Sequence, residues 1–389
     1  MALAAAPVAH ASLAPPVLTA PASYEASFGR IAGRVPPGTR RLVIRAGRRT
    51  LRILDVHRRT VDFSVELPRR EVTVSVSAYD SRGRSSTTAV PHVLGLPATA
   101  RPHGVRPYLN GGLQRRLRTA LGAFPGTSAA FVEDLNGGAG AAWNARARFP
   151  AASTLKLAIA VEVLRTIPGK PAPGSPFDRL LNTMLVDSSN EAANSLEILI
   201  GGSTSGGSAR VNALLRSLGL VDSEMYGGYL RGTYGRSPIP SRADAQPSFG
   251  RGKYTSAYDL ARLLALVHLA AGGKGLLTER YRGQLTPSDA RYLLYTLGLV
   301  PDRGKLGRFL PAGAVLLHKA GWISSARHDA GLVYWRGRVF VASVMTYGAG
   351  VGVASDTLAG RVARLALSLF EATRLPPAEH GRASYHRHA

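Results

Sequence analysis

A serine and a lysine three residues apart, Ser153 and Lys156, open an apolar stretch at residues 157–161. On a helix, positions i and i+3 share one face, so the serine hydroxyl and the lysine amine would be neighbours. A serine becomes a strong nucleophile when a base removes its proton, and a lysine whose pKa is lowered by burial can be that base. The same spacing also fits an N-cap serine followed by a solvated lysine, and on this tetrad alone that interpretation is favoured.

Two later segments place further polar residues beside predicted elements. Ser188 and Asn190 precede a helix of small residues, where they could serve only as a cap. Lys319 ends a short apolar strand and is followed by Ala320, Gly321 and an aromatic residue. A strand edge there could present the lysine to an anionic substrate, since glycine permits close approach of the backbone. An ordinary strand and turn with a surface lysine would have the same sequence.

The order of the three segments resembles that of serine β-lactamases and penicillin-binding proteins. In that superfamily S-x-x-K lies on a helix, S-x-N precedes a second helix, and K-[T/S/A]-G lies on a late strand. Residues 254–261, 310–313 and 318–331 are also similar to class A-like hydrolases of actinobacteria, and the resemblance covers residues 108–373. It implies an α+β fold of the β-lactamase/transpeptidase type, in which an antiparallel sheet is flanked by helices and an all-α subdomain is added.

The resemblance also implies how the matching residues act. Ser153 would attack the carbonyl carbon of the substrate after Lys156 takes its proton, and Ser188 would relay a proton to the leaving nitrogen. The backbone N–H groups of Ser153 and Trp322 would form the oxyanion hole. Loss of one such donor typically costs about 3 kcal/mol of transition-state stabilisation.

The remaining matches imply substrate binding. Asn190 would bind the amide of the substrate's side chain, and Lys319 would hold the substrate carboxylate and bias the proton relay. Ala320 and Gly321 would complete this substrate-binding segment. Ala320 stands where the family has threonine or serine, and the missing hydroxyl weakens or alters the expected recognition of that carboxylate.

A second departure concerns release of the acyl group. Class A β-lactamases carry a glutamate in an active-site loop, but the corresponding residues 219–253 contain no E-x-x-x-N motif. Glu224 is the best substitute by position, although the motif does not support it. Without such a base the acyl-enzyme should persist, as in a penicillin-binding peptidase or an esterase.

Residues 112–375 are predicted to form the hydrolase domain that positions these groups. A helix is expected from 112 to 121, a hairpin from 128 to 144, and helices from 154 to 218. A loop follows at 219–253, then a helix at 256–269, strands at 315–318, 328–335 and 338–346, and a final helix at 356–373. Residues 376–389 are polar and predict a disordered tail.

The N-terminal part has a different pattern. Residues 24–95 alternate apolar and polar side chains, strictly so at 61–65 and 72–76, which predicts a small antiparallel, immunoglobulin-like β-sandwich of five to seven strands. We expect a binding or spacer module, joined by a proline-containing linker at 96–111. Residues 1–23 are predicted to be a disordered leader or the remnant of a signal peptide, because Ala9-His10-Ala11 has the form of a cleavage site.

Composition limits the classes of partner. The net charge is +25, and only six of the 49 basic residues are lysine, as in proteins from GC-rich genomes such as those of actinobacteria. Codon bias explains this excess; attraction to a cell-wall polymer or a membrane surface is the functional alternative. The basic residues form no cluster or aromatic-basic pattern typical of nucleic-acid binding. With no cysteine and no ligand cluster at metal spacing, we expect no metal and no organic cofactor.

Three hypotheses follow. The first is a secreted or cell-envelope serine hydrolase that opens β-lactams or related amides through an acyl-enzyme on Ser153, with slow deacylation. The second is a D,D-peptidase or esterase that acts on cell-wall peptides. The third is a non-catalytic penicillin-recognising protein.

Overall fold

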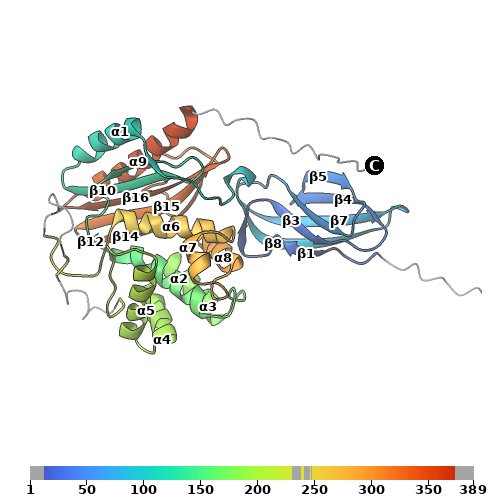
Figure 1. Cartoon of the computed structure of the whole chain (residues 1–389), viewed down its shortest axis with the longest axis horizontal. Helices are drawn as coiled ribbons and strands as arrows, with labels where there is room; N and C mark the ends of the chain where they lie inside the picture. Colours follow the sequence, from blue (N-terminus) through green and yellow to red (C-terminus); the bar gives the residue numbers. More distant parts are fainter. Residues whose placement is uncertain (1–12, 230–237, 241–245, 247, 373–389) are drawn as a thin grey trace, which may run out of the picture.

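The computed structural model describes residues 13–229, 238–240, 246 and 248–372. They form an N-terminal sandwich and a larger α+β unit, which lie side by side (Figure 1). The predicted tail, 376–389, and the first twelve residues of the predicted leader lie outside the described residues. Among those described, no helix combines the length and hydropathy that a membrane-spanning segment requires.

Two sheets build the sandwich, and in them successive side chains point to opposite faces. One sheet has the order β1-β3-β6 and the other β2-β8-β7-β4-β5. Leu42, Ile44, Val74 and Val76, all 0% exposed, lie in the core between them. The bounds are β1 (Val17–Ala20), β2 (Glu25–Ser27), β3 (Arg30–Arg34), β4 (Thr39–Ala46), β5 (Arg49–Asp55), β6 (Thr60–Ser64), β7 (Glu71–Asp80) and β8 (Ser85–Gly95).

Two predictions for this unit need correction, whereas the predicted number of strands is correct. Residues 24–95 contain seven strands, β2 to β8, and β1 lies within the predicted leader. Strand β2 pairs in parallel with β8, so the sandwich is not wholly antiparallel. The prediction that residues 1–23 form a leader is wrong for residues 13–23, which belong to the sandwich. Strand β1 pairs with β3, and Leu13 and Leu18 pack against the core. Such a short run of apolar residues beside prolines gave no strand periodicity.

The α+β unit contains a six-stranded sheet of order β14-β15-β16-β10-β11-β9. Its strands are β9 (Tyr108–Leu109), β10 (Thr127–Asp134), β11 (Ala139–Trp143), β14 (Val315–Ile323), β15 (Ala326–Trp335) and β16 (Arg338–Tyr347). The predicted antiparallel pairing is correct for five strands, but β9 runs parallel to β11, so the sheet is mixed. Strand β9 and the 3₁₀ turn Ala98–Ala100 lie within the predicted linker, and both are too short to show a period.

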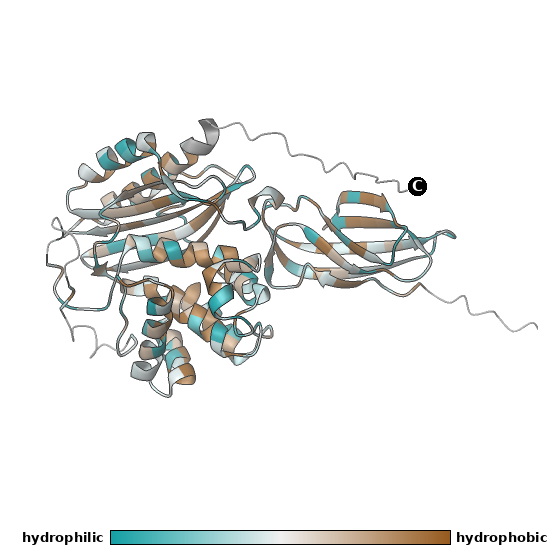
Figure 2. Ribbon diagram, viewed as in Figure 1, coloured by the Kyte–Doolittle hydropathy of each residue, from teal (hydrophilic) through white to brown (hydrophobic). Residues whose placement is uncertain are grey.

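Helices cover both faces of this sheet (Figure 1). Helices α1 (Gly111–Gly122) and α9 (Gly352–Ala372) pack on one face, around one apolar core. Helix α6 (Ala257–Ala271) packs on the other face, and a second, larger core extends from it into the helical region. That region comprises α2 (Lys156–Thr166), α3 (Pro176–Leu185), α4 (Asn190–Gly201), α5 (Thr204–Ser217), α7 (Gly275–Arg280) and α8 (Pro287–Leu297). Apolar residues gather on α2 and α6 (Figure 2).

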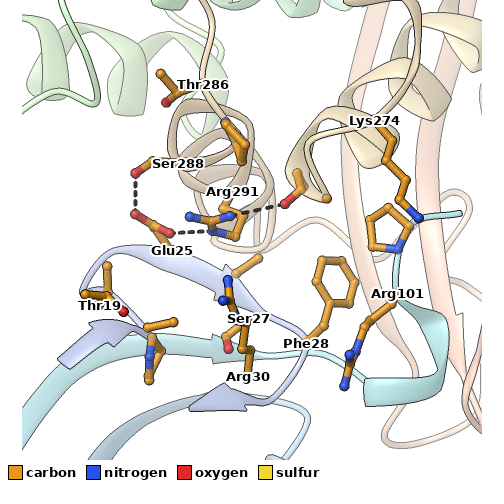
Figure 3. Close-up of a pocket in the computed structure, with 18 residues that line it drawn as sticks. Thr19, Glu25, Ser27, Phe28, Arg30, Arg101, Lys274, Thr286, Ser288 and Arg291 are labelled. Atoms are coloured by element: carbon orange, nitrogen blue, oxygen red, sulfur yellow. Dashed lines mark hydrogen bonds and ion pairs between the residues drawn. The ribbon is translucent and has the colours of Figure 1, made fainter. Parts of the chain in front are cut away.

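The sandwich contacts the α+β unit through a buried carboxylate. Glu25 on β2 is 2% exposed and accepts from Lys170 at 2.9 Å, Arg291 at 2.6 Å and Ser288 at 2.5 Å. Burial would raise the pKa of Glu25, but Arg291, Ser288 and Lys170 together lower it below its usual range. Glu25, Ser288 and Arg291 line a cavity of about 540 Å³ between the two units (Figure 3).

The Glu25→Ala variant is expected to lose about 3 kcal/mol of unfolding free energy at pH 7, because two cations lose their buried partner. Since the folded-state pKa of Glu25 is lowered, this stabilisation is present above the unfolded pKa and is lost as pH falls through the folded value. Urea unfolding at pH 7 and below pH 4 measures both effects. Asp55→Ala, on exposed strand β5, is the control, and an equal loss there would contradict the prediction.

Candidate functional site

Ser153 lies in a 3₁₀ turn, Ala152–Leu155, that leads directly into α2. In such a turn residues i and i+3 eclipse one another, which brings Lys156 under the serine. The turn is held to the segment that leads into strand β13 (Tyr254–Thr255), because the Ala151 N–H donates to the Lys253 carbonyl at 2.8 Å. Ala152 has a φ of +46°, a left-handed conformation that costs an alanine energy and that clusters at functional sites.

The Lys156 amine is fully buried, at 0% exposure, and faces three oxygens. Its Nζ lies 3.0 Å from Ser153 Oγ, 2.5 Å from the Ser188 carbonyl oxygen and 2.8 Å from Asn190 Oδ1. A neutral amine has two N–H bonds and one lone pair. The carbonyl and the amide oxygen can only accept, so they take the two N–H bonds and leave the lone pair for the Ser153 proton.

The surroundings of this amine favour its neutral form. Burial, and secondly the charge of Lys319, lower the pKa of Lys156 to about 7, while Glu191 opposes the change. A base with a pKa near neutrality is suited to taking a proton at physiological pH. The arrangement can therefore activate Ser153 as a nucleophile.

Ser188 connects this amine to a second buried lysine. Lys319 Nζ, on edge strand β14, donates to Ser188 Oγ at 2.8 Å and to the Ala320 carbonyl at 2.9 Å. Burial lowers the pKa of Lys319 to about 8. Ser188 has a φ of +61°, and the N-cap of α4 is its neighbour Ser189. The Ser188 hydroxyl is thus free of a capping role and faces the site.

Strand β14 passes directly against the turn that holds the nucleophile. A Cβ at Gly321 would lie 2.7 Å from the backbone nitrogen of Ser153 and 2.9 Å from that of Thr154, so only glycine fits. Ser153, Asn190 and Trp322 line a cavity of about 260 Å³ beside this contact. The structure thus brings the predicted residues of all three segments together; Ala320 adds its carbonyl oxygen to them.

Three functional candidates were missed in the sequence, namely Tyr229, Arg251 and Lys253, which also line this cavity. The Tyr229 ring lies 4.6 Å from Lys156 Nζ, and its hydroxyl donates to the Ala152 carbonyl at 3.0 Å. Its backbone N–H donates to Asn194 Oδ1 at 2.6 Å. The loop that carries Tyr229 has no regular period, so only its aromatic content could have pointed to it.

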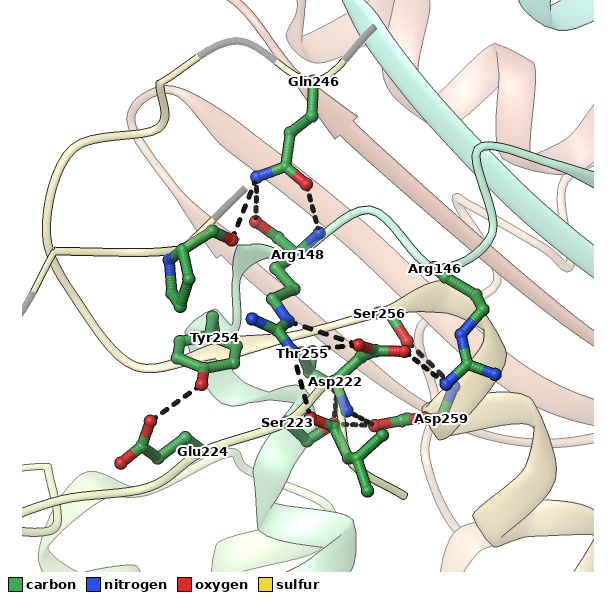
Figure 4. Close-up of polar contacts among 12 residues, drawn as sticks. Arg146, Arg148, Asp222, Ser223, Glu224, Gln246, Tyr254, Thr255, Ser256 and Asp259 are labelled. Carbon is green, nitrogen blue, oxygen red and sulfur yellow. Dashed lines mark hydrogen bonds and ion pairs between the residues drawn. The ribbon is translucent and has the colours of Figure 1, made fainter. Parts of the chain in front are cut away.

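Glu224 is not brought into the cavity. It is exposed, its backbone pairs with that of Tyr254, and its carboxylate accepts from the Tyr254 hydroxyl at 2.8 Å. Its neighbours in the chain are fixed by ion pairs, since Asp222 binds Arg146 at 2.8 Å and Arg148 at 3.2 Å (Figure 4). The loop sequence therefore places this carboxylate on the tyrosine, away from the lining of the cavity.

The sequence matches the beta-lactamase enzyme family over residues 112–173 and 169–370. The chain belongs to this family. No curated protein matches it in sequence. Among solved structures, PBP-A aligns with a TM-score of 0.54 at 21% identity, over 69% of this chain and 98% of that one. A beta-lactamase from Sphaerobacter thermophilus DSM 20745 aligns with a TM-score of 0.51 at 21% identity, over 68% of this chain and 98% of that one. An ancestral class A beta-lactamase, GNCA, aligns with a TM-score of 0.51 at 22% identity, over 66% of this chain and 100% of that one.

These likenesses show that this beta-lactamase family member has the β-lactamase/transpeptidase-like α+β fold, with a mixed sheet flanked by helices. The family match begins at residue 112 and so leaves the sandwich uncovered. Within the described ranges, histidine, aspartate and glutamate side chains form no group of three or more that could hold a metal ion.

The acylation efficiency of this family member is expected to be bell-shaped in pH. Below about pH 7 Lys156 is protonated and cannot take the Ser153 proton; above about pH 8 Lys319 loses the charge that would hold an anionic substrate. Stopped-flow acylation between pH 5 and 10 gives both limbs. Since Lys319 lowers the pKa of Lys156, Lys319→Gln should move the acidic limb to higher pH, whereas an unchanged limb would contradict this coupling.

Proposed function

We propose that the protein is a serine hydrolase that opens β-lactam or related amide bonds through an acyl-enzyme on Ser153. The observation that carries this proposal is the set of partners around Lys156. Two acceptors hold its N–H bonds and its third neighbour is the Ser153 hydroxyl, 3.0 Å away. The family match supports the same class of chemistry.

In the proposed reaction Lys156 takes the Ser153 proton while Oγ attacks the carbonyl carbon. The backbone N–H groups of Ser153 and Trp322 stabilise the oxyanion of the tetrahedral intermediate. The leaving nitrogen departs as the proton reaches it by way of the Ser188 hydroxyl, to which Lys319 donates. The acyl group then remains on Ser153 until water displaces it.

We infer that this displacement is slow. No aspartate or glutamate is among the described residues that line the cavity, and Glu224 binds Tyr254 instead. Within this described lining, a water molecule beside the acyl group would meet no carboxylate that could take its proton. This observation favours the second candidate function, a D,D-peptidase or esterase on cell-wall peptides, over an efficient β-lactamase.

A purely binding protein would have no need of the buried lysine pair. Lys156 and Lys319 are 0% and 3% exposed, and burying an ammonium group without a carboxylate partner is costly. Two buried lysines, each in contact with a serine hydroxyl, are expected of a site that transfers protons. The contacts of Lys156 therefore support catalysis over the non-catalytic hypothesis.

The test combines a fluorescent penicillin with a chromogenic cephalosporin, using wild type and Ser153→Ala. We expect a covalent adduct on wild type that is absent from Ser153→Ala, and turnover of the cephalosporin much slower than adduct formation. Rapid turnover would replace the slow-release proposal with an efficient β-lactamase. The absence of any adduct would overturn the β-lactam proposal and leave ester substrates for testing.

We also propose that the protein acts outside the cytoplasm, held at an anionic cell wall or membrane surface. The support is a group of exposed arginines on and around β4 and β5, in a stretch that contains one acid, Asp55: Arg34, Arg40, Arg41, Arg45, Arg48, Arg49, Arg52, Arg58 and Arg59. Attraction of this kind weakens as salt screens it. Retention on isolated cell envelopes that does not fall between low and high salt would contradict the proposal.

A further inference from the structure

We propose that the substrate carries a negative charge on the part that stays attached to Ser153, and that Arg251 recognises this charge. The inference rests on the acyl-enzyme proposed above and specifies its substrate. It comes from the cavity beside Ser153, which is lined by Arg251 and Lys253 on one segment and by Trp322 and Ile323 on another.

The lining of the cavity indicates which part of the substrate it takes. Ser153 and Asn190 line it, whereas Ser188 and Lys319, which face the leaving group, do not. Asn190 is the residue expected to bind the amide of the acyl side chain. A side chain that continues past this amide enters the space between Arg251 and Trp322.

The segment that carries Arg251 is fixed to its neighbours on both sides. Residue 251 forms a β-bridge with Pro238, and the Ile239 N–H donates to the Gly250 carbonyl at 2.8 Å. Two residues after Arg251, the Lys253 carbonyl accepts a hydrogen bond from the N–H of Ala151, which directly precedes the 3₁₀ turn that carries Ser153. Arg251 is exposed, and no ion pair joins it to any described residue, so its guanidinium is available at the cavity.

Lys253 adds positive potential behind Arg251. It is 7% exposed, and its Nζ lies 5.1 Å from the Tyr226 ring and 5.7 Å from the Tyr229 ring. Burial raises the pKa of Glu197, the acid that interacts with this lysine, to about 7. The Glu197 carboxylate accepts from Ser208 and lies behind Gly228.

The other carboxylates around the site also have partners elsewhere. Glu191 accepts from the Ser189 hydroxyl at 3.0 Å, and Glu224 accepts from Tyr254. Neither is among the residues that line the cavity. Arg251 is therefore a cation at the cavity for which no described carboxylate forms an ion pair, and a substrate carboxylate could bind it.

The wall formed by Trp322 and Ile323 is apolar. Trp322 is 65% exposed and Ile323 is 42% exposed, so both side chains are accessible to a bound molecule. An acyl side chain with an apolar group and a carboxylate would contact both walls. Arginine suits a carboxylate because its planar fork can donate two parallel hydrogen bonds.

Two penicillins that differ by one carboxylate test the inference, namely benzylpenicillin and its α-carboxy derivative, carbenicillin. We expect wild type to be acylated by carbenicillin about tenfold more efficiently than by benzylpenicillin, the size of one charge-assisted hydrogen bond. The ratio of the acylation efficiency with carbenicillin to that with benzylpenicillin should fall to about one in Arg251→Gln and below one in Arg251→Glu. Arg251→Lys should retain part of the preference for carbenicillin. Arg216→Gln, an equal charge change on exposed α5, should leave the ratio unchanged.

The outcomes separate the two proposals. If neither penicillin labels Ser153, the proposed function fails and the inference fails with it. If both label wild type but the ratio is close to one, or is the same in Arg251→Gln, the inference alone is overturned. Because the ratio compares two substrates on one protein, a partly unfolded variant does not change it.

Discussion

Replacing Lys156 by methionine is expected to lower the rate of Ser153 acylation about a thousandfold, within the range of general-base catalysis. The amine has the only lone pair among the groups that contact Ser153 Oγ within the described residues, and its pKa of about 7 supplies the neutral form. Methionine has a similar length and no basic atom. The nucleophile would then lack a base while the cavity wall stays intact.

The same change should raise the stability of the fold. Lys156 is fully buried without a carboxylate partner, so replacing its amine by a thioether removes an unfavourable desolvation. Thermal unfolding measured beside single-turnover acylation should therefore show opposite changes, a higher Tm and a lower rate. Normal acylation in Lys156→Met would show that another group takes the proton.

Replacing Gly321 by valine is expected to lower acylation efficiency at least a hundredfold, the typical effect of losing an oxyanion-hole donor. A Cβ there would lie 2.7 Å from the Ser153 nitrogen and 2.9 Å from that of Thr154, both backbone atoms that cannot rotate away. Strand β14 would have to move away from the 3₁₀ turn. The backbone donors at Ser153 and Trp322 would then separate.

A matched control is Gly122→Ala at the end of α1, where an added Cβ meets nothing within 4 Å. It should retain wild-type acylation and Tm. The measurement is the second-order rate of penicillin labelling, with circular dichroism to confirm that Gly321→Val is folded. Wild-type labelling in a folded Gly321→Val would refute the assignment of this backbone to the oxyanion hole.

The sequence alone was informative where chemistry is carried by short motifs with local geometry. Ser153 and Lys156 are three residues apart, and one turn of helix brings them together. The strands of the α+β unit were also predictable, because buried strands such as β16 and β15 show continuous apolar runs. By contrast, two-residue strands such as β9 depend on their partner and have no detectable period.

The loop around residues 219–253 shows the limit of sequence reasoning. Position along the chain favoured Glu224 as an active-site acid, but a hydrogen bond with Tyr254 and the neighbouring ion pairs of Asp222 place it elsewhere. The same loop brings Tyr229 over Lys156, and no motif predicted this. Loop side chains are positioned by distant partners, whose identity is not encoded in local spacing.

Ser153 and Lys156 show which properties follow from the sequence and which follow from the tertiary structure. Residue types and spacing by themselves determined which nucleophile and which base the chain offers, because a helical turn is a local structure. Only the tertiary structure decided that the pKa of the base is lowered to about 7, since its burial and the charge of Lys319 depend on segments far apart in the chain. The acceptors at Ser188 and Asn190 are likewise distant in sequence. The pKa of a buried group depends on everything packed around it, and that packing exists only in the folded protein.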